Sequence, residues 1–119
     1  MWIFSEHGFV SIVVNRYGDD QNEFLVRARC RADLERFEEL LPAGWAKEPW
    51  HAPPADYRWR ALANRGDVAE ALVAMMREHE YTNFKARVMQ TPSGMDPGRL
   101  HALHEVWAVM REFGAQNDG

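Results

Sequence analysis

The chain has 119 residues, of which 46% are hydrophobic and 27% charged, and its formal net charge at pH 7 is −4. This length and composition indicate one globular domain over residues 1–119, and the small net charge excludes a strongly basic nucleic-acid binder and an acidic DNA mimic. The apolar runs are far shorter than the ~20 residues of a membrane helix, and the lone cysteine, Cys30, excludes an internal disulfide. We therefore expect a soluble cytoplasmic domain with no membrane partner, frayed only at residues 116–119.

The first thirty residues predict three β-strands joined by short turns. Each strand segment is rich in aromatic and β-branched residues, and the turn signals are His7-Gly8 and the polar cluster 17–22. The three segments are 2–5, 9–17 and 23–31. Because short connections favour antiparallel neighbours, we expect a meander, and alternating aromatic and basic residues at 56–63 predict a fourth strand.

Apolar residues spaced by three and four predict three α-helices, each begun by an aspartate cap. The caps are Asp33, Asp67 and Asp96. The buried stripe of the middle helix is expected to run through Met76 and His79. Residues 81–90 fit a helix or a strand, and the helix is favoured. Strands followed by helices predict an α+β fold, in which one antiparallel sheet of three to four strands packs with two to three α-helices.

The sequence also predicts whether four further side chains are buried or exposed. Trp107 lies on the apolar stripe of the last helix and is expected in the core, and Cys30 is expected to point away from its arginine neighbours into the core. Trp45 and Trp50 lie in an irregular, proline-rich segment. They either anchor this segment by burial, which is the first interpretation, or contact a partner.

Basic residues recur at every second position along two of the predicted strands. They are Arg27, Arg29, Arg58 and Arg60. Because side chains i and i+2 share one face of a strand, neighbouring strands would bring these four guanidinium groups together. Guanidinium groups match carboxylate and phosphate geometry, so one interpretation is an anion-binding face with stacking from Tyr17, Tyr57 and Trp59. The other is an ordinary solvated strand face, whose arginines pair with acidic neighbours across the sheet.

Patterns typical of catalysis or metal binding are weak. His101 and His104 are three residues apart with Glu105 beside them, but the chain has no His-Glu-x-x-His pattern and no cysteines at zinc spacing. It also has no nucleophile motif and no phosphate-binding glycine loop. We expect no catalytic residue, no metal site and no cofactor, and a small metal-dependent enzyme using these three side chains is the least favoured hypothesis.

Five short sequence segments occur together in this chain, among them Met-Trp-Ile-Phe at 1–4 and Tyr-Thr-Asn-Phe-Lys at 81–85. The other three are 25–29, 56–60 and 104–110. The combination resembles a set of small, functionally uncharacterised proteins of bacteria and their mobile elements, of about this length, and covers nearly the whole chain. The resemblance implies a prokaryotic or phage origin. It implies no activity and no catalytic residue.

These observations lead to two functional hypotheses of different class. The first is a non-enzymatic binding protein that acts through a protein partner, for example a mobile-element or phage-type anti-defence factor such as an anti-CRISPR protein. The alternative is binding of nucleic acid or another polyanion by the arginine-rich sheet face. The residues expected at the contact surface are Arg27, Arg29, Arg58, Arg60 and Trp50.

Overall fold

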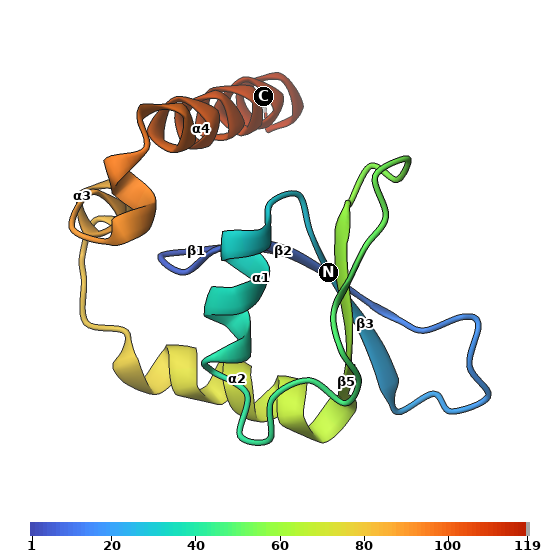
Figure 1. Cartoon of the computed structure of the whole chain (residues 1–119). Helices are drawn as coiled ribbons and strands as arrows, with labels where there is room; N and C mark the ends of the chain where they lie inside the picture. The colour runs from blue at the N-terminus through green and yellow to red at the C-terminus, as the bar shows by residue number, and fades with distance from the viewer. Residues whose placement is uncertain (119) are drawn as a thin grey trace. The chain divides into compact units, whose positions relative to one another are not determined.

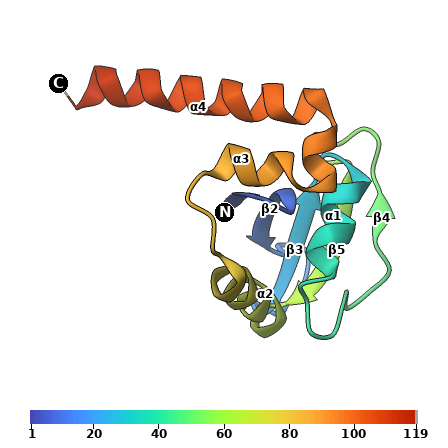
Figure 2. The ribbon, with the colours of Figure 1, turned by 90° about the vertical axis from the view of Figure 1, so that its left-hand side faces the viewer.

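The computed structural model describes residues 1–118, apart from the side chain of Ser93, and these residues form two compact units divided after Glu80. The first unit contains a β-sheet and two helices, and the second, which begins at Tyr81, is helical (Figures 1 and 2). Over the described residues there are five strands and four α-helices. The predicted α+β fold with one antiparallel sheet is confirmed, with one strand and one helix beyond the expected range.

The sheet is antiparallel throughout, and its strands lie in the order β1-β2-β3-β5-β4. The strands are β1 (Trp2–Ser5), β2 (Gly8–Val14), β3 (Glu23–Ala28), β4 (Trp50–His51) and β5 (Trp59–Asn64). The first three form the predicted meander, and β5 is the predicted fourth strand, displaced toward the C-terminus. The remaining strand, β4, was not predicted. It has two residues, which are too few to show an alternating pattern in the sequence.

Two helices, α1 (Arg31–Glu38) and α2 (Arg65–Glu78), pack on one face of the sheet and enclose the hydrophobic core with it (Figure 2). The sheet contributes Val10, Ile12, Val26, Ala28, Ala61 and Ala63. The helices contribute Leu34, Phe37, Val68, Ala71 and Met75. Because successive strand residues point to opposite faces, the residues between these core positions lie on the face away from α1 and α2. We call this the arginine face, after Arg27 and Arg60.

Helix α1 begins without the predicted aspartate cap. Its N-cap residue is Cys30, whose side chain makes no capping hydrogen bond and is exposed, so the prediction of a buried Cys30 is wrong. Strand β3 ends at Ala28, and the alternation that would bury Cys30 ends with it. Asp33 lies inside the first turn of α1, is 3% exposed, and accepts a 2.9 Å hydrogen bond from the Phe9 N–H. Asp33 therefore binds the start of β2 instead of its own helix end.

Helix α2 is capped by Asn64, and the prediction of Asp67 is wrong. The Asn64 side chain accepts a 2.7 Å hydrogen bond from the Gly66 N–H. The buried residues of α2 are Val68, Ala71 and Met75. This spacing turns Met76 outward, where it is 70% exposed, and the exposed His79 is the C-cap residue. Both were wrongly expected on the buried stripe.

The identity of this cap is testable by substitution. Asn64→Ala is expected to cost about 1 kcal/mol of unfolding free energy, because an alanine leaves the Gly66 N–H without its acceptor. Asp67→Ala removes only a favourable charge near the helix start, worth roughly 0.3–1 kcal/mol. Urea unfolding of the two variants measures the difference. A greater loss for Asp67→Ala than for Asn64→Ala would restore the original prediction.

The second unit contains three helical segments. They are α3 (Phe84–Met89), the 3-10 helix η1 (Pro92–Met95) and α4 (Pro97–Asn117). The helix favoured within 81–90 is confirmed by α3. The cap Asp96 is also confirmed, since its side chain accepts a 2.9 Å hydrogen bond from the Gly98 N–H.

Two expectations concern the last helix, and one of them is wrong. Trp107 is 50% exposed, so its prediction as a core residue is wrong. Its helix, α4, contains no buried residue among those described, and an apolar stripe predicts burial only where another element covers it. The fraying expected over 116–119 stays a prediction; α4 continues to Asn117, and residue 119 lies outside the described residues.

Candidate anion-binding face

The register of the two central strands places two arginines opposite each other. β3 and β5 are antiparallel neighbours, and Arg27 pairs directly with Arg60. Val26, Ala28 and Ala61 are each 0% exposed on the core side, so both arginines point to the arginine face. Like charges at directly opposed positions destabilise a sheet, and the contacts of these two side chains therefore decide what the face can do.

Arg27 is held by two buried neighbours. Its Nη2 donates a 2.7 Å hydrogen bond to Ser11 Oγ, and its guanidinium carbon lies 4.6 Å from the centroid of the Tyr57 ring. Ser11 is 1% exposed and Tyr57 is 4% exposed. The Nε of Arg27 is buried and has no hydrogen-bond partner among the described residues. The Arg27 guanidinium is therefore held by the buried Ser11 and Tyr57 side chains, and its Nε–H donor is unused.

Two further arginines adjoin the same tyrosine. The Nε of Arg60 donates a 3.0 Å hydrogen bond to the Tyr57 backbone oxygen. The guanidinium of Arg29, just beyond the end of β3, lies 4.5 Å from the Tyr57 ring centroid, and its Nη1 donates to the Asp56 backbone oxygen at 3.3 Å. Within residues 1–118, no carboxylate forms an ion pair with Arg27, Arg29 or Arg60. The acidic pairing expected of an ordinary strand face is missing from this part of the chain.

The remaining expected surface residues lie at the margin of this cluster. Trp50 pairs with Arg60 in the register of β4 and β5, and it is 40% exposed. Arg58 precedes β5 and is exposed, and its backbone oxygen accepts a 2.7 Å hydrogen bond from the Ala52 N–H. The structure thus brings Arg27, Arg29 and Arg60 together around Tyr57 and leaves Arg58 at the strand end.

The aromatic residues divide between the two sides of the sheet. Tyr57 joins the arginines as predicted, but Trp59 pairs with Ala28 and packs against the core, so it does not stack beside them. Trp45 also packs against the core, as the interpretation of a buried anchor predicts. The same interpretation is wrong for Trp50, which is exposed. Tyr17 is 78% exposed and lies over the arginine face.

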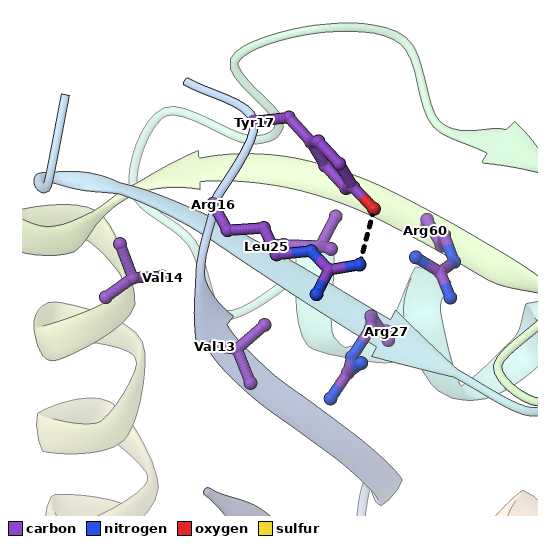
Figure 3. A pocket seen from close by; sticks show the side chains of 7 residues that line it. All are labelled: Val13, Val14, Arg16, Tyr17, Leu25, Arg27 and Arg60. Carbon is purple, nitrogen blue, oxygen red and sulfur yellow. Dashed lines mark hydrogen bonds between the residues drawn. The ribbon is translucent and has the colours of Figure 1, made fainter. Parts of the chain in front are cut away.

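A depression of about 420 Å³ opens beside the opposed arginines (Figure 3). Its lining residues are Val13, Val14, Arg16, Tyr17, Leu25, Arg27 and Arg60. Sequence reasoning missed Arg16, which lies in the turn after β2. The signal that points to it is the hairpin itself: the Asn15 N–H donates to the Glu23 oxygen at 2.9 Å, so the turn residues fold back beside β3.

Carboxylates gather on the helix side of the same sheet. A second depression of about 450 Å³ is lined by Glu35, Glu38 and Glu48 together with Trp45 and Trp59. One of these carboxylates, Glu35, binds Arg31 on α1 at 2.6 Å. The acidic side chains in this region therefore do not neutralise the arginine face.

The two histidines of α4 do not converge with other metal ligands. His101 Nε2 lies 3.9 Å from Glu105 Oε1, whereas His104 Nδ1 lies 3.2 Å from the amine of Lys85 and its ring stacks on Trp107. An ammonium group beside His104 opposes a bound cation. Across the described part of the chain, no group of three His, Cys, Asp or Glu side chains is placed to hold a metal.

Comparisons with family models, curated proteins and solved structures return no match for this chain. The resemblance to small bacterial and mobile-element proteins therefore stays a prediction. None of the helices described has the length and apolar character needed to cross a membrane.

Proposed function

We propose that this protein is a binding protein whose arginine face recognises an acidic segment of a protein partner. Arg27, Arg29, Arg58 and Arg60 supply the cationic contacts, and Trp50 supplies an aromatic contact at the margin. One observation carries the proposal: Arg27 and Arg60 are directly opposed across two central strands, with no ion-paired carboxylate among the described residues.

Ligand binding has a physical reason to be favourable at this place. The two opposed guanidinium groups repel each other in the free protein, and Ser11 and Tyr57 hold them close to the sheet. A carboxylate between them removes the repulsion and accepts two parallel N–H hydrogen bonds from a guanidinium fork. Because the side chains are already positioned, little conformational entropy is lost on binding.

The charge distribution favours a protein partner over nucleic acid. Phosphate-backbone binding draws its affinity from many simultaneous cationic contacts, whereas this face offers five arginines, including Arg16, on a chain with a net charge of −4. Arginine and tryptophan are enriched at protein interfaces, where few residues supply most of the binding energy. An anti-defence role, such as that of an anti-CRISPR protein, is one form of this proposal, and the partner's identity tests it.

A direct binding assay tests the proposal with defined probes. The probes are a labelled Asp/Glu-rich peptide and a single-stranded oligonucleotide of the same net charge, each titrated with the intact chain. We expect the peptide to bind, and the double variant R27Q/R60Q to weaken that binding at least about tenfold, because each lost charged hydrogen bond contributes about 1.5–3 kcal/mol.

The matched control is R31Q/R77Q, which removes the same charge from two exposed arginines on α1 and α2. It is expected to bind the peptide as the wild type does. An equal loss in the control would show that net charge alone is responsible and would contradict the proposal. Tighter binding of the oligonucleotide, with affinity falling steeply as salt rises, would establish the nucleic-acid alternative instead.

A further inference from the structure

The depression beside the opposed arginines has a more specific chemistry than the face as a whole. Three guanidinium groups line it, from Arg16, Arg27 and Arg60, and they come from the turn after β2 and from the two central strands (Figure 3). None of the three forms an ion pair with a carboxylate of residues 1–118. Three positive charges thus line the depression without an ion-paired carboxylate among the described residues.

The amount of charge distinguishes between anions. A carboxylate carries one negative charge and leaves two of the three guanidinium groups unneutralised. A phosphate monoester carries about −1.5 to −2 charges at pH 7 and offers three strong acceptor oxygens. Three guanidinium groups around one depression therefore match a phosphate monoester better than a carboxylate.

The rest of the lining is apolar and aromatic. Val13 and Leu25 form part of the wall, and the Tyr17 ring stands at its edge, with its hydroxyl 2.6 Å from Arg16 Nη2 (Figure 3). An aromatic ring attached to the phosphate would contact this apolar wall, whereas a short aliphatic phosphate would leave the wall without a contact. The volume of about 420 Å³ lies within the roughly 300–1,000 Å³ range of small-molecule sites.

We propose that this depression binds an aryl phosphate, namely a phosphorylated tyrosine side chain in the acidic segment of the partner. The inference rests on the proposed function, because it names the group that the arginine face selects. Arg27 and Arg60 bind phosphate oxygens from the sheet, Arg16 closes over them from the turn, and Val13, Leu25 and the Tyr17 ring contact the aromatic ring.

Titration of the intact chain with small probes tests the chemistry of the site. The probes are phenyl phosphate, inorganic phosphate and benzoate, followed by amide NMR shifts at pH 7.5, where the phosphate monoester is mostly dianionic. We expect phenyl phosphate to bind most tightly and benzoate most weakly, with shifts at residues 13–17, 25–27 and 60. Benzoate binding as tightly as phenyl phosphate would overturn the inference, since the site would then respond only to a ring and one charge.

A single variant separates this inference from the proposed function. R16Q is expected to weaken phenyl phosphate binding about tenfold by removing one charged contact. It is expected to weaken binding of the unphosphorylated acidic peptide by a much smaller factor, because the carboxylate contacts of the proposed function are made by Arg27 and Arg60. The matched control R77Q, on α2, should change neither affinity. Unaltered phenyl phosphate binding by R16Q would overturn the inference while the proposed function stands.

The source of the phosphate is tested in the same assay. A peptide containing phosphotyrosine is compared with the same peptide containing phosphoserine, and with adenosine monophosphate. Tightest binding of the phosphotyrosine peptide supports the inference. Tightest binding of adenosine monophosphate would assign the depression to a nucleotide, and equal binding of the two phosphopeptides would show that the apolar wall selects no ring; either result overturns the inference as stated.

Discussion

Replacing Asp33 with alanine is expected to lower the free energy of unfolding by about 3–5 kcal/mol, the usual cost of breaking a buried ion pair by removing one partner. The Asp33 side chain is 4% exposed, and its Oδ1 binds Arg36 Nη2 at 2.6 Å. Its other oxygen accepts the Phe9 N–H at 2.9 Å, and Arg36 Nε donates to the His7 backbone oxygen at 2.7 Å. One carboxylate thus connects α1 to the start of β2 and, through Arg36, to the turn that precedes it.

Urea unfolding measures this loss, with Glu35→Ala as the control. Glu35 belongs to the same helix and is also ion-paired, but its side chain is 55% exposed, so its removal is expected to cost no more than about 0.5–1 kcal/mol. Gly8 gives an independent check on the same junction: its φ is +123°, and an added Cβ would lie 2.5 Å from the Asp33 carboxylate. Gly8→Ala should therefore also destabilise the fold. A loss below about 1 kcal/mol for Asp33→Ala would show that the junction is not a stabilising contact.

Phe37→Ala is expected to cost about 3–5 kcal/mol, as truncation of a buried aromatic side chain does. Phe37 is 1% exposed and lies in the core cluster between α1 and the sheet, with its ring centroid 6.3 Å from that of Trp45. An alanine leaves a cavity that neighbouring side chains fill only in part. Thermal and urea unfolding, followed by far-UV circular dichroism, measure the effect.

Trp107→Ala is the informative comparison for Phe37→Ala. The Trp107 side chain is 50% exposed, with Lys85 Nζ at 4.9 Å and the Arg111 guanidinium at 5.6 Å from its ring. Exposed cation–π contacts contribute about 0.5–1 kcal/mol each, so we expect a cost of about 1–2 kcal/mol. Equal losses for the two variants would place Trp107 in a core, as the apolar stripe of its helix first suggested.

Local patterns in the sequence were sufficient for most of the fold. Alternating residues located four of the five strands, and three-and-four spacing with a proline after Asp96 located the last helix and its cap. The errors arose where a long-range partner decides the outcome. Aspartate is a common N-cap residue, but Asp33 binds the N–H of Phe9, which is distant in the sequence. The residues near Trp107 in the sequence do not show whether another element covers its side chain.

The candidate site was predictable in part for the same reason. Alternation placed Arg27 and Arg60 on one face, but their direct pairing depends on the register of β3 and β5, which is set by the whole meander. Trp59 was wrongly grouped with the arginines, since strand alternation itself puts it on the face opposite its neighbour Arg60. Arg16 gave no periodic signal, since its position over β3 follows from the fold of the turn.

The repulsion between the two opposed arginines lowers the stability of the sheet, and this loss supports a binding role for the arginine face. Two opposed guanidinium groups lower the stability of a sheet, yet buried groups on Ser11 and Tyr57 hold them in place. A single carboxylate opposite either arginine would relieve the repulsion within the chain. In our proposal the partner supplies that negative charge, so binding and stabilisation of the fold are coupled.

The most direct test of this account is an NMR titration of the intact, nitrogen-15-labelled chain with the Asp/Glu-rich peptide, following the arginine Nε–H signals. We predict that the signals of Arg27, Arg29 and Arg60 shift in proportion to peptide binding. Those of Arg31 and Arg36, whose Nε groups are bonded to Glu35 and to the His7 oxygen, should stay in place. Binding that moves the Arg31 and Arg36 signals and leaves the Arg27 and Arg60 signals unchanged would contradict the account.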